Sequence, residues 1–150
     1  MSNKELVKTA LTQLFIHGDM NALDKYWADQ YTQHNPQIGN GHQAVKQLFA
    51  AVPPGFKYDM GLIVEDGDFV MVHGRYTGIA PKPLIAVDIF RVNNGKLAEH
   101  WDVLQEEVPA EETARVADRR LQSVPLAQGV IQKMKNGRDQ RNRMCLIMRL

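Results

Sequence analysis

Two aspartates and a histidine occur together in one short stretch, residues 87–103, which reads VDIFRVNNGKLAEHWDV. Asp88, His100 and Asp102 lie among residues that favour β-strands, although aspartate itself is depleted in strands. A buried carboxylate must be paired, hydrogen-bonded or protonated, so the group indicates a polar cluster in an apolar pocket. The alternative is that some of these side chains face water. In a pocket, a carboxylate can act as a general base, and a histidine can give or take a proton.

The turn of this hairpin decides which of the three side chains share a face. With a two-residue loop, Asn94-Gly95, the side chain of Asp88 would point away from the polar residues of the second strand. With a three-residue loop over 93–95 and its glycine in the left-handed region, Asp88 lies opposite His100, and Asp102 joins them. We expect the three-residue loop, because it gathers the polar side chains together.

Further polar and aromatic side chains are candidates for the same pocket. His34 lies in the segment YTQHNP before a predicted helix, and His73 lies in a predicted strand. His73 could instead be a core histidine with one partner, and His34 a loop residue exposed to water. Loops beside a rigid sheet often carry function, which favours His34. The expected substrate-binding residues are Asn35, His73, Trp27, Tyr31 and Phe90.

Known catalytic and metal-binding motifs are missing from the sequence. There is no GxGxxG, P-loop or GxSxG segment, and no spacing of histidines, acids and cysteines matches HExxH or a Cys/His metal site. We therefore expect no metal. Cys145, the single cysteine, has no partner for an internal disulfide and no evident catalytic setting.

Helices are predicted in the first third of the chain. The first follows Ser2, which stands at capping-box spacing from Glu5, and Gly18 ends it. A short second helix begins after Asp19, and a third spans 41–52 with its apolar residues on one side.

The hydrophobic period then changes from helical to alternating. Two consecutive hairpins are predicted, the first around Asp66-Gly67. Residues 29–40 are expected to be extended and loop-like. Helices followed by a run of strands indicate an α+β fold, with the helices packed on one face of an antiparallel sheet. The predicted strands are 56–65, 69–78, 84–92 and 96–107.

The composition is that of one globular domain of 150 residues with a formal net charge of +1. No run of apolar residues is long enough to span a membrane, and the N-terminus lacks the features of a signal peptide, so we expect a cytoplasmic protein. Aromatic and basic residues do not alternate, so no nucleic-acid partner is expected. Residues 113–150 are expected to be a basic C-terminal extension of unclear structure: a native extension, a dimer-covering arm or the product of a shifted reading frame.

The segments YTQHNP, GHQAV and VDIFRVNNGKLAEHWDV resemble the SnoaL-like branch of the NTF2-like superfamily, over about residues 1–112. The resemblance implies a cone in which a strongly bent sheet encloses a pocket, and a homodimer formed through the outer sheet face. It also implies ring closure by intramolecular aldol condensation of a carbonyl substrate, without metal or organic cofactor.

The resemblance assigns roles to individual residues. Asp102 matches the catalytic aspartate of the cyclases, and Asp88 stands where those enzymes have a histidine, which is a departure. The polar pocket position near the first loop falls at His34 or Asn35. Asp102 would be the base, and His100 or His34 would orient the carbonyl or stabilise the enolate. The two carboxylates could also share a proton and titrate together.

Three functions remain open from the sequence. The first is a cofactor-independent enzyme for aldol condensation, cyclisation or isomerisation. The second is a non-catalytic module that binds a ligand or a protein, since one fold hosts many functions. The third is a hydratase or epoxide-type hydrolase that uses Asp88 and Asp102 around a water molecule.

Overall fold

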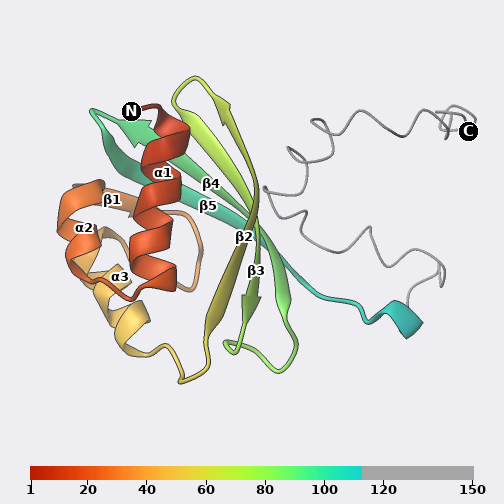
Figure 1. Cartoon of the computed structure of the whole chain (residues 1–150). Coiled ribbons are helices and arrows are strands. Elements are labelled where there is room, and N and C mark those ends of the chain that lie inside the picture. The colour runs from red at the N-terminus through yellow and green to blue at the C-terminus, as the bar shows by residue number, and fades with distance from the viewer. Residues whose placement is uncertain (113–150) are drawn as a thin grey trace, which may run out of the picture.

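The computed structural model describes residues 1–112, which form an α+β fold with helices packed on one side of a five-stranded sheet (Figure 1). The predicted extension 113–150 lies outside the described residues. No helix among residues 1–112 is long and apolar enough to cross a membrane. The elements are α1 (Asn3–Leu11), a π-helical turn η1 (Thr12–Ile16), α2 (Asn21–Tyr26), β1 (Trp27–Gln33), α3 (Gly41–Ala50), β2 (Lys57–Asp66), β3 (Phe69–Thr77), β4 (Leu84–Asn93), β5 (Lys96–Glu106) and a 3₁₀ turn η2 (Ala110–Glu112).

The start of α1 follows the predicted capping chemistry, whereas Met20 and not Asp19 stands at the N-cap of α2, although the Asp19 side chain bonds the first residue of that helix. Ser2 Oγ accepts the backbone N–H of Glu5 at 3.2 Å, and Asp19 Oδ1 accepts the backbone N–H of Asn21 at 3.0 Å. Between these two helices, Gly18 adopts a φ of +69°, which a glycine tolerates best. The chain can therefore reverse sharply, and this brings α2 to the edge of the sheet.

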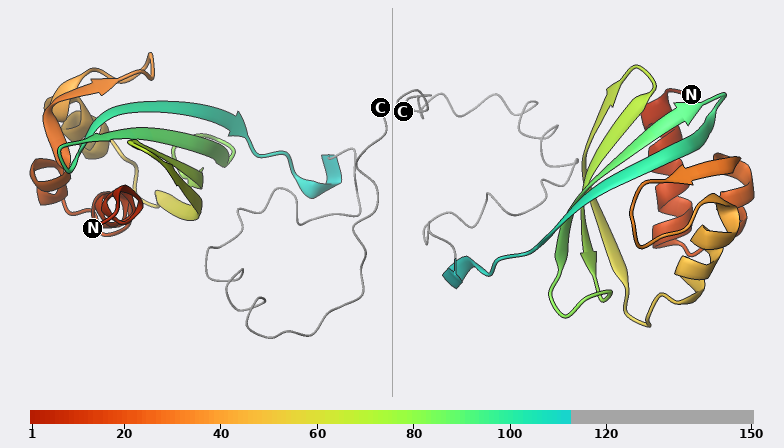
Figure 2. Two further views of the ribbon diagram at one scale, coloured as in Figure 1. Left: turned by 90° about the horizontal axis from the view of Figure 1, so that it is seen from above. Right: turned by 180° about the vertical axis from the view of Figure 1, so that it is seen from behind.

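The sheet is mixed, and the prediction of a purely antiparallel sheet was wrong. Its strand order is β1-β5-β4-β3-β2, with antiparallel pairs except for β1, which runs parallel to β5. Residues 29–40 are predicted to be extended and loop-like, and their first part, up to Gln33, belongs instead to strand β1. Trp27 and Tyr31 explain why β1 forms, because both side chains are buried and anchor this polar segment along the edge of the sheet. Figure 2 shows the sheet curving around the helices.

The hairpin between β4 and β5 turns at Asn94-Gly95, so the predicted three-residue loop was wrong. Asn93 pairs with Lys96, and the two loop residues have φ values of +50° and +72°. Asparagine and glycine are the residues that best tolerate positive φ at both central positions, and such a turn matches the twist of the strands. The turn alone would place Asp88 away from the polar side chains of β5.

A β-bulge reverses that outcome. Leu97 pairs with Val92 and Glu99 pairs with Arg91, so Ala98 is an extra residue in β5. The extra residue shifts the register by one, and a shift of one exchanges the two faces of a strand. Beyond the bulge, Asp88 lies directly opposite Asp102 and His100 lies opposite Phe90. Asp88, His100 and Asp102 therefore share the face that packs beneath the helices.

A glycine in β3 creates space for a tyrosine on the inner face of the sheet. A Cβ atom on Gly74 would lie 2.6 Å from Cε2 of Tyr58, which is closer than side chains pack. Gly74 therefore lets the ring of Tyr58 cross β3 and reach Asp88 on the next strand.

Candidate functional site

A pocket of about 380 Å³ lies between the inner face of the sheet and the helices. Two acidic side chains and a histidine line it, Asp88, Asp102 and His100, and most of the other lining residues are apolar or aromatic. This combination of apolar walls and a few polar groups is typical of a site for a small molecule. The lining residues are Phe15, Trp27, Tyr31, Gln33, Asn35, Gln37, Ile38, Val45, Leu48, Phe49, Val52, Phe56, Tyr76, Ile79, Ala80, Leu84, Asp88, Phe90, His100, Asp102 and Leu104.

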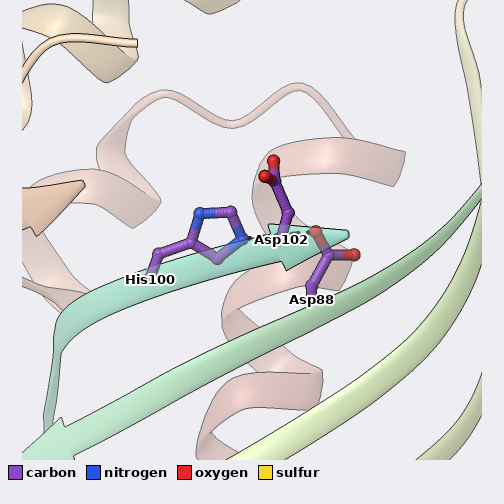
Figure 3. Close-up of side chains that lie close together, drawn as sticks. All are labelled: Asp88, His100 and Asp102. Atoms are coloured by element: carbon purple, nitrogen blue, oxygen red, sulfur yellow. Dashed lines mark hydrogen bonds and ion pairs between the residues drawn. The ribbon is translucent and has the colours of Figure 1, made fainter. Parts of the chain in front are cut away.

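Asp88 on β4 and the pair His100 and Asp102 on β5 stand on the same side of the sheet (Figure 3). His100 Nε2 lies 3.2 Å from Asp88 Oδ1, and polar atoms of the three residues all lie within 4.8 Å of one another. Asp88 is 2% exposed and His100 is 7% exposed, whereas Asp102 is half-buried. Asp102 is therefore the carboxylate of this cluster that is more open to a ligand.

Asp88 accepts hydrogen bonds from two tyrosines as well as contacting His100. Tyr76 Oη lies 3.2 Å from Oδ1 and 3.1 Å from Oδ2, and Tyr58 Oη lies 3.4 Å from Oδ2. Burial and then the Asp88 charge raise the pKa of both tyrosines well above the usual value. Both hydroxyls therefore stay protonated at physiological pH, and they act as donors to a carboxylate that is satisfied within the protein.

Asp102 has a different partner. Asn35 Nδ2 donates to Asp102 Oδ2 at 2.6 Å. The amide is held in this orientation because Asn35 Oδ1 accepts the backbone N–H of Gln37 at 2.8 Å. The carboxylate therefore has a defined orientation, and Asn35 is its one side-chain hydrogen-bond partner among residues 1–112.

Three of the expected substrate-binding aromatic residues, Trp27, Tyr31 and Phe90, line the pocket, as does Asn35. Tyr31 is 3% exposed, and its burial is the main cause of a strongly raised pKa. Its hydroxyl is therefore a neutral hydrogen-bond donor or acceptor in the pocket.

His34 lies outside the pocket, on the other face of the sheet. Its ring stacks on Trp101 with 4.4 Å between centroids, and Nε2 lies 3.1 Å from Glu99 Oε2. The hydrogen bonds from His34 and Arg91 hold the pKa of Glu99 below its usual value. His34 precedes Asn35, and neighbouring residues of an extended chain point in opposite directions, so only Asn35 reaches the pocket.

His73 is also outside the pocket. It pairs with Val87, and its neighbours on β3, Val72 and Gly74, are buried under the helices. Because side chains alternate along a strand, His73 points to the outer face.

Gln33, Tyr58 and Tyr76 belong to the polar cluster, and the sequence analysis did not single them out. Gln33 contacts His100, and the tyrosines contact Asp88. Alternation along β3 could have placed Tyr76 on the inner face. The position of Tyr58 on the inner face depends on the bulge in β2 between Met60 and Ile63, which the sequence does not indicate.

The cluster of Asp88, His100 and Asp102 could in principle supply three ligands to a metal ion. However, Asp88 and His100 are already engaged by Tyr58, Tyr76 and Gln33, and a metal would have to displace these partners. We therefore interpret the cluster as a hydrogen-bonded network.

The comparisons with known proteins agree with this architecture. The model of the SnoaL-like domain matches residues 9–100, so the chain belongs to the SnoaL-like family of the NTF2-like superfamily. A comparison with curated protein sequences finds no match.

Solved structures of low sequence identity share the fold. IdmH from Streptomyces antibioticus, a candidate polyketide cyclase, is 18% identical, with a TM-score of 0.56 over 69% of this chain and 92% of that chain. A candidate ketosteroid isomerase from Kribbella flavida is 14% identical, with a TM-score of 0.64 over 81% of this chain and 90% of that one. TsrD from Streptomyces laurentii is 20% identical, with a TM-score of 0.56 over 67% and 85% of the two chains.

Proposed function

We propose that this protein is a cofactor-independent enzyme that uses Asp102 to move a proton next to a carbonyl group, in an aldol condensation, cyclisation or isomerisation. The observation that carries the proposal is the contrast between the two carboxylates. Asp88 is buried with Tyr58, Tyr76 and His100 around it, whereas Asp102 faces the pocket and is oriented by Asn35. The SnoaL-like family and its structural neighbours are consistent with this chemistry.

The proposed reaction conserves protons within the pocket. The Asp102 carboxylate removes a proton from the carbon next to the substrate carbonyl, and the enolate attacks a second carbonyl of the same molecule. The resulting alkoxide then takes the proton back from Asp102. In an isomerisation, the proton would return to a different carbon of the enolate. The apolar walls would limit the access of water to the enolate.

We assign the carbonyl-binding role to Asn35 and Tyr31. Both ring nitrogens of His100 face protein acceptors, Gln33 and Asp88, so this ring has no N–H left for a substrate. Asn35 retains a second amide hydrogen, and Tyr31 offers a hydroxyl; both residues line the pocket. In this proposal His100 hydrogen-bonds to Asp88 and does not contact the substrate, and His34 has no part in the reaction.

An exchange experiment tests the proposal without knowledge of the natural substrate. The probe is 2-tetralone, an apolar ketone, whose α-protons are followed by NMR in deuterated water. We expect the wild type to accelerate exchange and Asp102→Asn to lose about 100-fold or more of that rate, with an unchanged circular dichroism spectrum. Asp29→Asn, at an exposed position on β1, is the matched control. Full activity in Asp102→Asn would refute the role of Asp102.

The other functions predict different results. A non-catalytic binding module would bind 2-tetralone without exchange in any variant. A hydratase or epoxide hydrolase would need both carboxylates around a water molecule, and the three partners of Asp88 argue against that arrangement.

We also propose that the chain forms a homodimer through the outer face of the sheet. One row across four strands, Val64, Met71, Ile89 and Trp101, presents apolar side chains on this face. Val64 is 43% exposed and Met71 is 37% exposed, and the adjacent Val103 is 66% exposed. Contiguous apolar surface of this kind is typical of an interface between protein chains.

A further inference from the structure

Gln33 at the end of β1 contacts both His100 and the backbone of Asn35, the residue that bonds Asp102. Its Oε1 accepts the backbone N–H of Asn35 at 3.0 Å and lies 2.9 Å from His100 Nδ1. Its own backbone N–H donates to Asn40 Oδ1 at 2.7 Å. The carboxamide of Gln33 is therefore held by the same loop that positions Asn35 against Asp102.

The contact with a backbone donor identifies the atom that faces His100. A backbone N–H can only donate, so the atom of Gln33 that it meets must be the carbonyl oxygen. This oxygen has no proton to offer, and Nδ1 of His100 must supply the hydrogen of their contact. The orientation of the carboxamide thus fixes a proton on Nδ1.

The second ring nitrogen of His100 also faces an acceptor. Nε2 lies 3.2 Å from Asp88 Oδ1, and this carboxylate accepts from Tyr58 and Tyr76 as well. A hydrogen bond between Nε2 and Oδ1 needs one proton between them. With Nδ1 already protonated, His100 and Asp88 together form a pair of zero net charge, most simply an imidazolium beside a carboxylate.

We propose that Gln33 is a positioning residue that keeps Nδ1 of His100 protonated and thereby neutralises the charge of Asp88. Without this acceptor, a neutral ring could donate from Nε2 to Asp88 and leave the pair negative. The groups around the ring are Gln33 on β1, Asp88 and Phe90 on β4, and Asp102 on β5. A neutral pair means that Asp102 carries the net negative charge in this part of the pocket.

The inference deepens the proposed function but does not need it for its test. It explains how two aspartates can sit opposite each other without sharing one proton, because the nearby histidine compensates one of them. The base would then be Asp102 alone. The proton on Nδ1 can be observed in the ligand-free protein, so the experiment does not require turnover.

The test is NMR of the full chain with ¹⁵N-labelled histidine at pH 7, read through long-range ¹⁵N–¹H correlations. The His100 signals are identified by their loss in His100→Gln. We expect a protonated Nδ1 in the wild type and in Gln33→Glu, which keeps an acceptor. In Gln33→Met, which keeps the length but lacks the amide oxygen, we expect Nδ1 to lose its proton. Gln30→Met, at an exposed position on the same strand and outside the pocket lining, is the matched control.

Two results would overturn the inference. One is an unprotonated Nδ1 in the wild type, which is decisive even if the variants fail to fold. The other is a folded Gln33→Met protein in which Nδ1 stays protonated as in the wild type. A failure of Asp102→Asn to reduce proton exchange would refute the proposed function and leave this result unaffected. Where the enzyme is active, Gln33→Met should lower kcat more than it raises KM.

Discussion

Asn35 and Asp102 lie 67 residues apart in the sequence and meet at 2.6 Å in the pocket, where the amide of one donates to the carboxylate of the other. The contact joins the loop after β1 to the second strand of the last hairpin. It exists because β1 runs parallel to β5 and His34 N donates to His100 O at 2.9 Å at the end of β1. The orientation of Asp102, the proposed base, thus depends on β1, a strand that was not predicted from the sequence.

Replacing Asn35 should impair proton transfer without unfolding the protein. A hydrogen bond to a charged group contributes about 1.5–3 kcal/mol, so Asn35→Ala should lower the exchange rate of 2-tetralone by about 10–100-fold. Asn35→Asp should lower it further, because two carboxylates at this distance cannot both be ionised. Gln30→Ala, at an exposed position on β1 outside the pocket lining, serves as the control. An unchanged rate in Asn35→Ala would show that Asp102 is oriented by other groups.

The two tyrosines around Asp88 should differ in their contribution to stability. Tyr76 reaches both carboxylate oxygens at 3.1 and 3.2 Å, whereas Tyr58 reaches one at 3.4 Å. Removal of a hydroxyl from a buried carboxylate costs about 1.5–3 kcal/mol, and we expect Tyr76→Phe to lie at the upper end and Tyr58→Phe at the lower end. Urea unfolding of the two variants measures this difference. Equal destabilisation would contradict the assigned hydrogen bonds.

The tyrosines also predict how stability depends on alkaline pH. Burial raises the pKa values of Tyr31, Tyr58 and Tyr76 above the usual value of 10.0. The folded protein then binds these protons more tightly than the unfolded chain does, so the stability from this source is complete below pH 10 and falls as the pH rises beyond it. In an absorbance titration, three of the four tyrosines should ionise only as the protein unfolds. Ionisation of all four near pH 10 with the fold intact would contradict this.

The helices could be predicted from the sequence because their signals are local. The cap at Ser2 and the break at Gly18 act within one turn of helix, and both were found where the sequence indicated them. The strand β1 is different. Its seven residues carry mostly polar side chains, and only the docking of Trp27 and Tyr31 onto the core stabilises it as a strand. No local pattern distinguishes such a segment from a loop.

The shared face of Asp88, His100 and Asp102 was predicted, but through the wrong geometry. The turn residues are those of a two-residue loop, and the bulge at Ala98 returns the three side chains to one face, with Asp88 opposite Asp102 and not opposite His100 as the longer loop predicted. Leu97 and Ala98 are both buried, and this interruption of the alternating pattern was visible in the sequence as two consecutive apolar residues. The pair Leu97-Ala98 between Lys96 and Glu99 is therefore the sequence signal of the bulge.

The outer face of the sheet leads to a prediction about assembly. Val103 is 66% exposed and lies on the same face of β5 as Trp101, the apolar face that the helices leave uncovered. If a second copy covers this face, then Val103→Glu would bury an unpaired carboxylate and should convert a dimer into a monomer in sedimentation velocity. Ile16→Glu is the matched control, because Ile16 is 51% exposed in η1, on the helical side of the molecule. A wild-type protein that is monomeric at micromolar concentration, or a Val103→Glu variant that remains dimeric, would contradict assembly through this face.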